Sequence, residues 1–264
     1  MKVDDIVQAM DRITPLSISK GVCEKFGDYD NSGLLMNFCR GEVDSVLVAL
    51  DASMPVLSEA VSLGAQMIVT HHPVIYAPVK SVGADDLTTR KILTAAEHGI
   101  SIFSAHLNLD SAPGGINDQF AALCGLKESR NLFDLDGESG YLRLGELEHP
   151  RSLEEYRSEL SKSFGPFVRA VGDPDKQIRR VAVVNGGAGS LYSRARKAGA
   201  DCFVSGDFRH HEYRDALDLG ITLIDIPHYD AEKFYMRILA GRLSEALPGI
   251  SVRESRSEVR PFWQ

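Results

Sequence analysis

The stretch Met67-Ile68-Val69-Thr70-His71-His72-Pro73 decides how the chain is organised. A short apolar run is followed by two adjacent histidines and a proline. The run is typical of a buried strand, and the proline marks its end. Upstream, Val46-Leu47-Val48-Ala49-Leu50 predicts another buried strand, which ends at Asp51. Residues 54–63, between the two strands, predict an amphipathic helix closed by Gly64.

The same alternation of apolar strands and helices continues along the chain. It predicts the α/β class, with mostly parallel sheets covered by helices on both faces. The polar, turn-rich segment 27–35 is not expected to form a regular element, and residues 127–150 give a weaker pattern. The remaining predicted strands are 100–104, 141–144, 167–171, 181–184, 202–205, 221–224 and 250–253, and the remaining helices are 4–12, 86–98, 113–124, 152–163, 190–198, 209–218 and 230–246.

An internal repeat divides the chain into two related lobes. The strand-helix-strand unit that begins at Val46 recurs at Val181, with a constant offset of 135 residues over about 25 positions. In this alignment His71-His72 falls on Gly206-Asp207 and Asp51 falls on Gly186. We therefore expect a first α/β lobe at 1–126 and a second at 127–264, related by duplication, although a short strand-helix-strand likeness can also arise by chance.

Composition narrows the class of function. The chain has 264 residues, of which 44% are hydrophobic, and a formal net charge of −8. An acidic protein without clustered Lys and Arg is not expected to bind nucleic acid or anionic membranes in general, because phosphate contacts need basic side chains. The four cysteines form no CxxC pair, and the N-terminus lacks the pattern of a secretory signal. We expect reduced thiols, no membrane span and a cytoplasmic location.

The residues that suggest chemistry all follow predicted strands at their carboxyl ends. His71 and His72 follow one strand, Asp110 another, and His228 a third. Ligands bind at this edge of open parallel sheets, because the loops there can converge. His228 and Glu232 are four residues apart at the start of a helix and so share one face. Histidines and carboxylates together are a divalent-metal ligand set.

Adjacent histidines point to opposite faces of a regular strand, so His71 and His72 fit two metals better than one. Two ions roughly 3.5–4 Å apart, with Glu232 and Asp110 as bridging and terminal carboxylates, would use both histidines. The alternative for each motif taken alone is a surface feature without metal. His106 is either a further ligand or a group that orients one, and we favour the second.

The other histidines and the glycine-rich segment 186–190 have simpler interpretations. His210-His211 begins a polar helix, and a solvated helix start is favoured over a ligand role. His98 and His149 are expected at the surface. Residues 186–190 read Gly-Gly-Ala-Gly-Ser, which fits a tight strand-to-helix turn or a modest anion site. The loop lacks the spacing of a dinucleotide fingerprint.

Three sequence blocks resemble the NIF-three-like proteins, which are also described as dinuclear metal-centre hexameric proteins and as type 2 homologues of GTP cyclohydrolase I. The likeness spans nearly the whole chain. The blocks, in order, are Asp30-Asn31-Ser32-Gly33-Leu34 with the strand at 48–51 and Ile68-Val69-Thr70-His71-His72-Pro73; Ala105-His106-Leu107-Asn108-Leu109-Asp110 with Gly114-Gly115-Ile116-Asn117; and Val204-Ser205-Gly206-Asp207 with Pro227-His228-Tyr229-Asp230-Ala231-Glu232.

The resemblance implies two divalent metal ions per chain, a homohexameric ring and a set of five ligands. By motif those ligands are His71, His72, Asp110, His228 and Glu232, at a site shared between the lobes. Zn, Fe, Mn, Ni and Co all suit such ligands. The chain departs from the family pattern at Leu107, where a small polar residue is usual, and at Pro227, where glycine is usual. Neither change removes a ligand.

These observations favour a metal-dependent hydrolase acting on a nucleotide-like or other phosphorylated small molecule. His106 or Asp51 would relay protons. The family label suggests GTP as substrate. The rival hypothesis is a metal-binding or regulatory scaffold without turnover.

Overall fold

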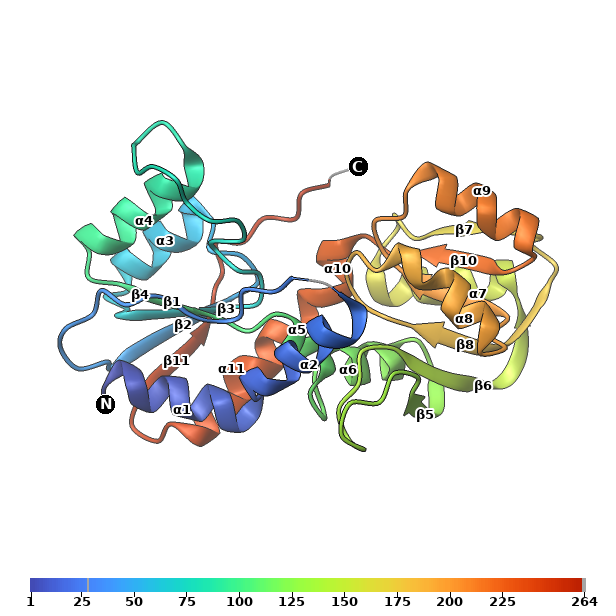
Figure 1. Ribbon diagram of the computed structural model, residues 1–264, viewed down its shortest axis with the longest axis horizontal. Coiled ribbons are helices and arrows are strands. Elements are labelled where there is room, and N and C mark those ends of the chain that lie inside the picture. Colours follow the sequence, from blue (N-terminus) through green and yellow to red (C-terminus); the bar gives the residue numbers. More distant parts are fainter. Residues whose placement is uncertain (28, 263–264) are drawn as a thin grey trace. The chain divides into compact units, whose positions relative to one another are not determined.

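The computed structural model describes residues 1–27 and 29–262, which form two compact units (Figure 1). One unit contains the described residues of 1–109 together with 235–262, and the other contains residues 110–234. The sequence placed the division at 126/127 and kept the C-terminus in the second lobe. The chain instead returns, because its last strand pairs with the sheet of the first unit.

The sheet of the first unit is mostly parallel, as predicted. Its strand order is β1-β4-β3-β2-β11, and only β1 is antiparallel to its neighbour. The bounds are β1 Gly33–Met36, β2 Ser45–Ala49, β3 Met67–Thr70, β4 Ser101–Ser104 and β11 Ser251–Glu254. β1 corrects the expectation that residues 27–35 lack regular structure: Leu34 and Met36 pair with β4 despite the polar residues before them.

Helices cover both faces of this sheet. α3 and α4 pack on one face through buried residues such as Val56, Leu57 and Ala95, and α1 and α11 lie on the other (Figure 1). The helices are α1 Val3–Ile13, α2 Leu16–Phe26, α3 Met54–Ser62, α4 Leu87–Glu97, α5 Leu107–Ser111, which crosses the division between the units, and α11 Phe234–Ala246. Their apolar stripes bury against strands that are themselves buried, so this unit has a core on each side of the sheet.

The second unit has a mixed sheet. Its order is β5-β6-β8-β9-β10-β7, in which β8, β9 and β10 are parallel and the outer strands are antiparallel. The weakly patterned segment 127–150 contributes to β5 and β6. The strands are β5 Leu126–Asn131, β6 Arg143–Ser152, β7 Arg169–Val171, β8 Gln177–Val183, β9 Cys202–Ser205 and β10 Thr222–Asp225.

Two separate cores flank the second sheet. Phe120, Tyr156 and Leu160 bring α6 and α7 onto one face, and Ala195 and Ala216 bring α8 and α9 onto the other. The helices are α6 Ile116–Leu123, α7 Leu153–Phe164, the short 3-10 turn η1 Gly189–Leu191, α8 Tyr192–Lys197, α9 His210–Leu219 and α10 His228–Glu232. The predicted α/β class with two lobes is therefore confirmed.

The predicted repeat is visible in the element bounds. β3 begins at residue 67 and β9 at residue 202, which is the predicted offset of 135, and both strands are four residues long. β4 and α5 begin at residues 101 and 107, and β10 and α10 begin at 222 and 228, so a second constant offset of 121 relates them. A five-residue helix thus follows the equivalent strand in each half of the repeat: α5 follows β4, and α10 follows β10.

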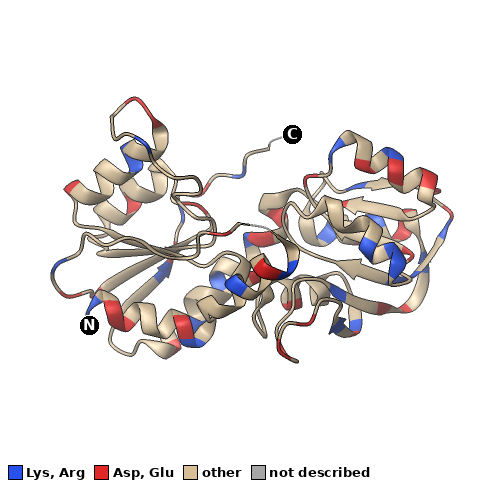
Figure 2. Cartoon of the chain, viewed as in Figure 1, with Lys and Arg blue, Asp and Glu red and all other residues tan. Residues whose placement is uncertain are grey.

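The described residues contain no helix that is both long and apolar enough to cross a bilayer. All four cysteines are free thiols. In Figure 2, basic and acidic residues are interspersed over the helices of each unit.

Candidate metal-ligand groups in the two units

His71 and His72 lie immediately beyond β3, where the backbone still follows the sheet. Their amides donate to the carbonyls of Ala49 and Leu50 at 3.2 and 2.9 Å. Thr70 Oγ1 adds a bond to the His72 carbonyl at 2.9 Å. The backbone of both histidines therefore continues the hydrogen bonding of the strand. Their side chains differ in exposure: His71 is fully buried and His72 is partly exposed.

Each of these histidines has its Nδ1 within hydrogen-bond distance of an oxygen atom. Nδ1 of His71 lies 2.8 Å from the carbonyl oxygen of Ala105, and Nδ1 of His72 lies 2.9 Å from Oδ1 of Asp51. Histidine ligands usually donate one ring N–H to a carbonyl or carboxylate, which fixes the tautomer and directs the other nitrogen to the metal. Here that other nitrogen is Nε2 in both rings.

The loop that carries Asp51 depends on the far end of the chain. Glu258 accepts hydrogen bonds from the amides of Leu50 and Asp51 at 2.6 and 2.9 Å. The predicted proton-relay residue Asp51 is thus placed beside His72, where its observed contact is the ring nitrogen.

His106 belongs to the same cluster in the first unit. Its Nδ1 lies 2.7 Å from Asp30, whose side chain is 1% exposed. Burial raises the pKa of Asp30, but hydrogen bonds from His106 and two serines lower it more, so the pKa lies well below its usual range. Asp30 is therefore an anion that fixes the orientation of His106.

The three imidazoles lie close enough to hold one ion. Candidate ligand atoms of His71, His72 and His106 lie within 4.8 Å of one another. The ring centroid of His71 is 4.8 Å from that of His72 and 5.2 Å from that of His106. Imidazole suits Zn, Fe, Ni and Cu, so the first unit by itself presents a group of residues that could hold a transition metal.

The second unit presents a carboxylate-rich group at the start of α10. His228 Nδ1 lies 2.7 Å from Asp207, and its Nε2 lies 3.2 Å from Glu232. Burial lowers the pKa of His228, but the carboxylates of Glu232 and Asp207 raise it more, to about 11. A half-buried site that favours an imidazolium this strongly has excess negative charge, which a metal cation would also neutralise.

Asn185, which the sequence analysis did not single out, joins the two buried carboxylates. Its side-chain amide lies 2.8 Å from Asp110 Oδ1 and 2.8 Å from Glu232 Oε1. Its own backbone amide donates to Asn117 at 2.8 Å. All four side chains are at least nine-tenths buried. The available signal was its position two residues beyond β8, at the same sheet edge as the other candidates.

Gly186 is required by its surroundings. A Cβ at this position would lie 2.6 Å from Glu232 Oε1 and 3.3 Å from His228, and φ is +66°. A Cβ at Gly189 would lie 2.7 Å from Glu212 Oε2 and 2.9 Å from the ring of Phe208. Packing therefore accounts for Gly186 and Gly189, and the prediction of an anion site at the 186–190 turn stays a prediction.

The remaining sequence candidates lie at the surface. His210 and His211 are exposed at the start of α9, as the favoured reading predicted, and His98 and His149 are exposed as well. Of the two departures from the family pattern, Leu107 is buried and Pro227 immediately precedes α10.

The fold and these ligand groups define a class: a duplicated α/β protein with histidines and carboxylates at the carboxyl edges of its parallel strands. Comparison with known families agrees, since the Duf34/NIF3 (NGG1p interacting factor 3) family matches residues 1–261. The chain belongs to this family.

Relatives match over most of their length. A GTP cyclohydrolase 1 type 2 homolog of Clostridium acetobutylicum is 31% identical over 99% of this chain and 98% of its own. One from Clostridium perfringens is 31% identical over 88% and 87%. A hypothetical protein of Staphylococcus aureus has a similar structure, with a TM-score of 0.87, 27% identity and coverage of 100% and 99%. A Bacillus cereus protein related to NIF3 shares the fold at a TM-score of 0.88, with 21% identity over 100% of this chain and 99% of that one.

Proposed function

We propose that the ligand groups of the two units together complete one dinuclear divalent-metal centre. The ligands are His71, His72, Asp110, His228 and Glu232. The observation that carries the proposal is the same in all three histidines: Nδ1 is engaged by a carbonyl or a carboxylate, as in histidines prepared for metal binding through Nε2. The two buried carboxylates, Asp110 and Glu232, also favour a cation nearby, and a metal ion would supply that charge.

The proposed activity is hydrolysis of a nucleotide-like or other phosphorylated small molecule. When bound, two divalent ions polarise a phosphoryl or carbonyl group and supply hydroxide at neutral pH. Asp51 then serves to hold His72, and Asn185 sets the separation of Asp110 from Glu232. His106, which is partly exposed and backed by the anionic Asp30, is the residue best placed to carry a proton.

The proposed substrate class follows from the names of relatives, whereas the proposed metal centre follows from side-chain contacts. Matching relatives carry the name GTP cyclohydrolase 1 type 2 homolog, which puts GTP first among the substrates to test. The second candidate function is a metal-binding or regulatory scaffold without turnover. The burial of His71 and Glu232 favours this second function, because metal sites with a structural role are closed to solvent, whereas catalytic sites keep an open position.

Metal content and turnover separate these functions. We expect purified protein to contain two divalent ions per chain, measured by elemental analysis, and Glu232→Ala to lose both the metal and the hydrolysis of GTP or model phosphoesters. Glu245→Ala, an exposed residue on α11, is the matched control. Two metals with no turnover on any tested substrate would favour the scaffold, and fewer than one metal per chain after metal-replete purification would exclude the dinuclear centre.

We also propose that the protein is a homohexamer, as the sequence resemblance implies. Light scattering after size exclusion measures this directly. A mass near six times 28.9 kDa is the expected result, and a monomer or dimer at all concentrations would refute it.

A further inference from the structure

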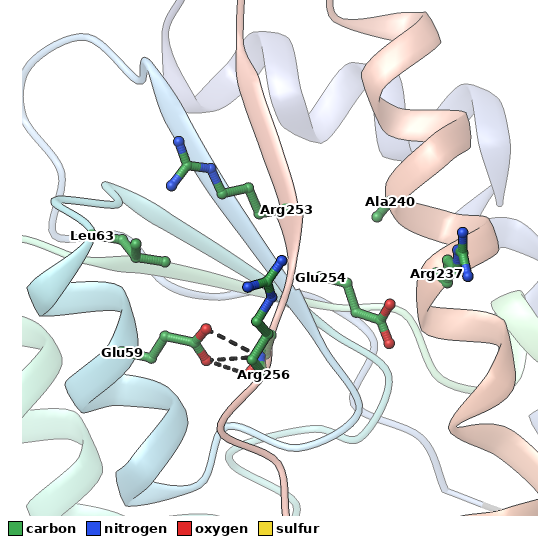
Figure 3. Close-up of a pocket in the computed structure, with 8 residues that line it drawn as sticks. Glu59, Leu63, Arg237, Ala240, Arg253, Glu254 and Arg256 are labelled. Carbon is green, nitrogen blue, oxygen red and sulfur yellow. Dashed lines mark hydrogen bonds between the residues drawn. The ribbon is translucent and has the colours of Figure 1, made fainter.

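A cavity of about 750 Å³ lies beside β11, at the edge of the first unit's sheet (Figure 3). Residues of α3, of α11, and of β11 and the segment just after β11 line this cavity. Its lining includes three arginines, namely Arg237 on α11, Arg253 on β11 and Arg256 just beyond the strand. None of these residues belongs to the ligand groups described above.

The position of Arg256 is fixed by Glu59. The Glu59 carboxylate accepts hydrogen bonds from Ser255 Oγ at 2.5 Å and from the backbone amide of Arg256 at 3.0 Å (Figure 3). It also accepts one from the backbone amide of Ser257 at 3.0 Å. These bonds turn the chain away from the strand direction after β11. Because neighbouring positions of a straight strand alternate between faces, Arg253 and Arg256 would otherwise project oppositely. The bend lets both line the same cavity.

The cavity carries an excess of positive charge. Within residues 1–27 and 29–262, the guanidinium groups of Arg237, Arg253 and Arg256 form no ion pair or hydrogen bond. The carboxylate of Glu59 is already committed to the backbone, which leaves Glu254 as the other acidic residue of the lining. Three cations together are unexpected in a chain whose formal net charge is −8.

We propose that this cavity binds a phosphorylated small molecule through these three arginines. A guanidinium presents two parallel N–H donors that match the oxygens of a phosphate, and a phosphate group carries a charge of about −1.5 to −2. The volume is within the range of small-molecule sites. Leu63 at the end of α3 and Ala240 on α11 add apolar surface on opposite sides of the cavity for the organic part of such a ligand. This site is separate from the proposed metal centre and does not depend on it.

Calorimetric titration of the full chain with inorganic pyrophosphate tests the proposal. The Glu232→Ala background removes phosphate binding to the proposed metals. We expect saturable binding in that background, and a loss of affinity of about tenfold or more in Arg253→Gln/Arg256→Gln, since charge-assisted bonds to phosphate are among the strong ones. Arg237→Gln alone tests the other wall of the cavity. Arg214→Gln, an exposed arginine on α9, is the matched control.

Two results would overturn the proposal. One is undiminished binding in both the double variant and Arg237→Gln. The other is an equal loss in Arg214→Gln, which would indicate general attraction to the surface. Because the arginines are exposed, the variants should keep the melting temperature of the parent protein, and that measurement accompanies the titration.

Discussion

The side-chain amide of Asn185 lies 2.8 Å from Oε1 of Glu232 and bridges that carboxylate to Asp110 at the same distance. Removing this amide leaves two buried carboxylates without a shared donor. We expect Asn185→Leu to weaken zinc binding by about 10–100-fold, the usual effect of losing a group that orients ligands. Competition with a chromophoric chelator measures the affinity.

The control for this variant is Gln177→Leu, at the exposed beginning of β8. It makes the same chemical change on the strand that precedes Asn185 and should leave metal affinity unchanged. Asn185→Leu with unaltered affinity would mean that the carboxylates hold their positions without the amide.

Gly186 offers a second test of the same geometry. In Gly186→Ala the new methyl group would lie 2.6 Å from Glu232 Oε1, so the carboxylate must move. We expect loss of metal binding together with a destabilisation of about 1–2 kcal/mol from the left-handed backbone. Gly220→Ala has a similar φ, +71°, and nothing within 4 Å. It should show the loss of stability in urea denaturation but retain the metal, and equal metal content in the two variants would argue against the contact.

Metal stoichiometry distinguishes ligands from residues that only position them. We expect His71→Ala and His72→Ala each to reduce bound metal below two ions per chain. His106→Ala should keep the full metal content and lose turnover, because His106 is not among the proposed ligands and its proposed role is proton transfer, with Asp30 orienting the ring. Reduced metal in His106→Ala would make it a ligand, as the cluster of three imidazoles also allows.

The C-terminal segment should contribute stability that depends on pH. Burial raises the pKa of Glu59, but hydrogen bonds from Ser255 and the following amides lower it more, so its folded-state pKa lies below 4.5. A depressed pKa contributes stability above the unfolded-state value, which is lost as pH falls through the folded-state value. The difference in unfolding free energy between wild type and Glu59→Gln should be largest near pH 7 and shrink below pH 4.5. Urea titrations across this range measure it, and a difference independent of pH would contradict the ionised role.

Cysteine reactivity provides a test of the core of the second unit that contains both Cys124 and Cys202. Burial raises the pKa of Cys202 to about 12 and that of Cys124 well above its usual range. Cys23 and Cys39 are only half-buried. Because the thiolate is the nucleophile, iodoacetamide at pH 8 should modify the latter two in the native protein and reach Cys124 and Cys202 only after denaturation. Mass spectrometry of the peptides gives the order, and early modification of Cys202 would indicate an open second unit.

Much of the fold was predictable because the central strands are short apolar runs bounded by turns. The strand before His71 and its counterpart before Gly206 have the predicted bounds and offset. α10 and α11 were expected as one helix, although the chain breaks it at Lys233. β5 and β6 were weakly marked because their residues alternate between core and solvent less regularly. Local pattern cannot identify strands whose pairing depends on distant partners.

The repeat also shows that equivalent positions in the two units carry different residues. Asp51 and Gly186 occupy equivalent positions, yet only the first has room for a side chain, because Glu232 lies against the second. His228 corresponds to the buried Leu107 in the first unit.

The sequence by itself determined the α/β class, the repeat, the family and the residues that suggest metal chemistry, because strand periodicity and ligand types are local properties of the chain. Only the tertiary structure decided the return of the C-terminus to β2 and the support of Asp51 by Glu258, 207 residues away. It also decided the contacts that orient the rest: Asp30 against His106, and Asn185 between two carboxylates. These are pairings of single side chains across long loops, and nothing in the spacing of residues along the chain specifies which distant partners will meet.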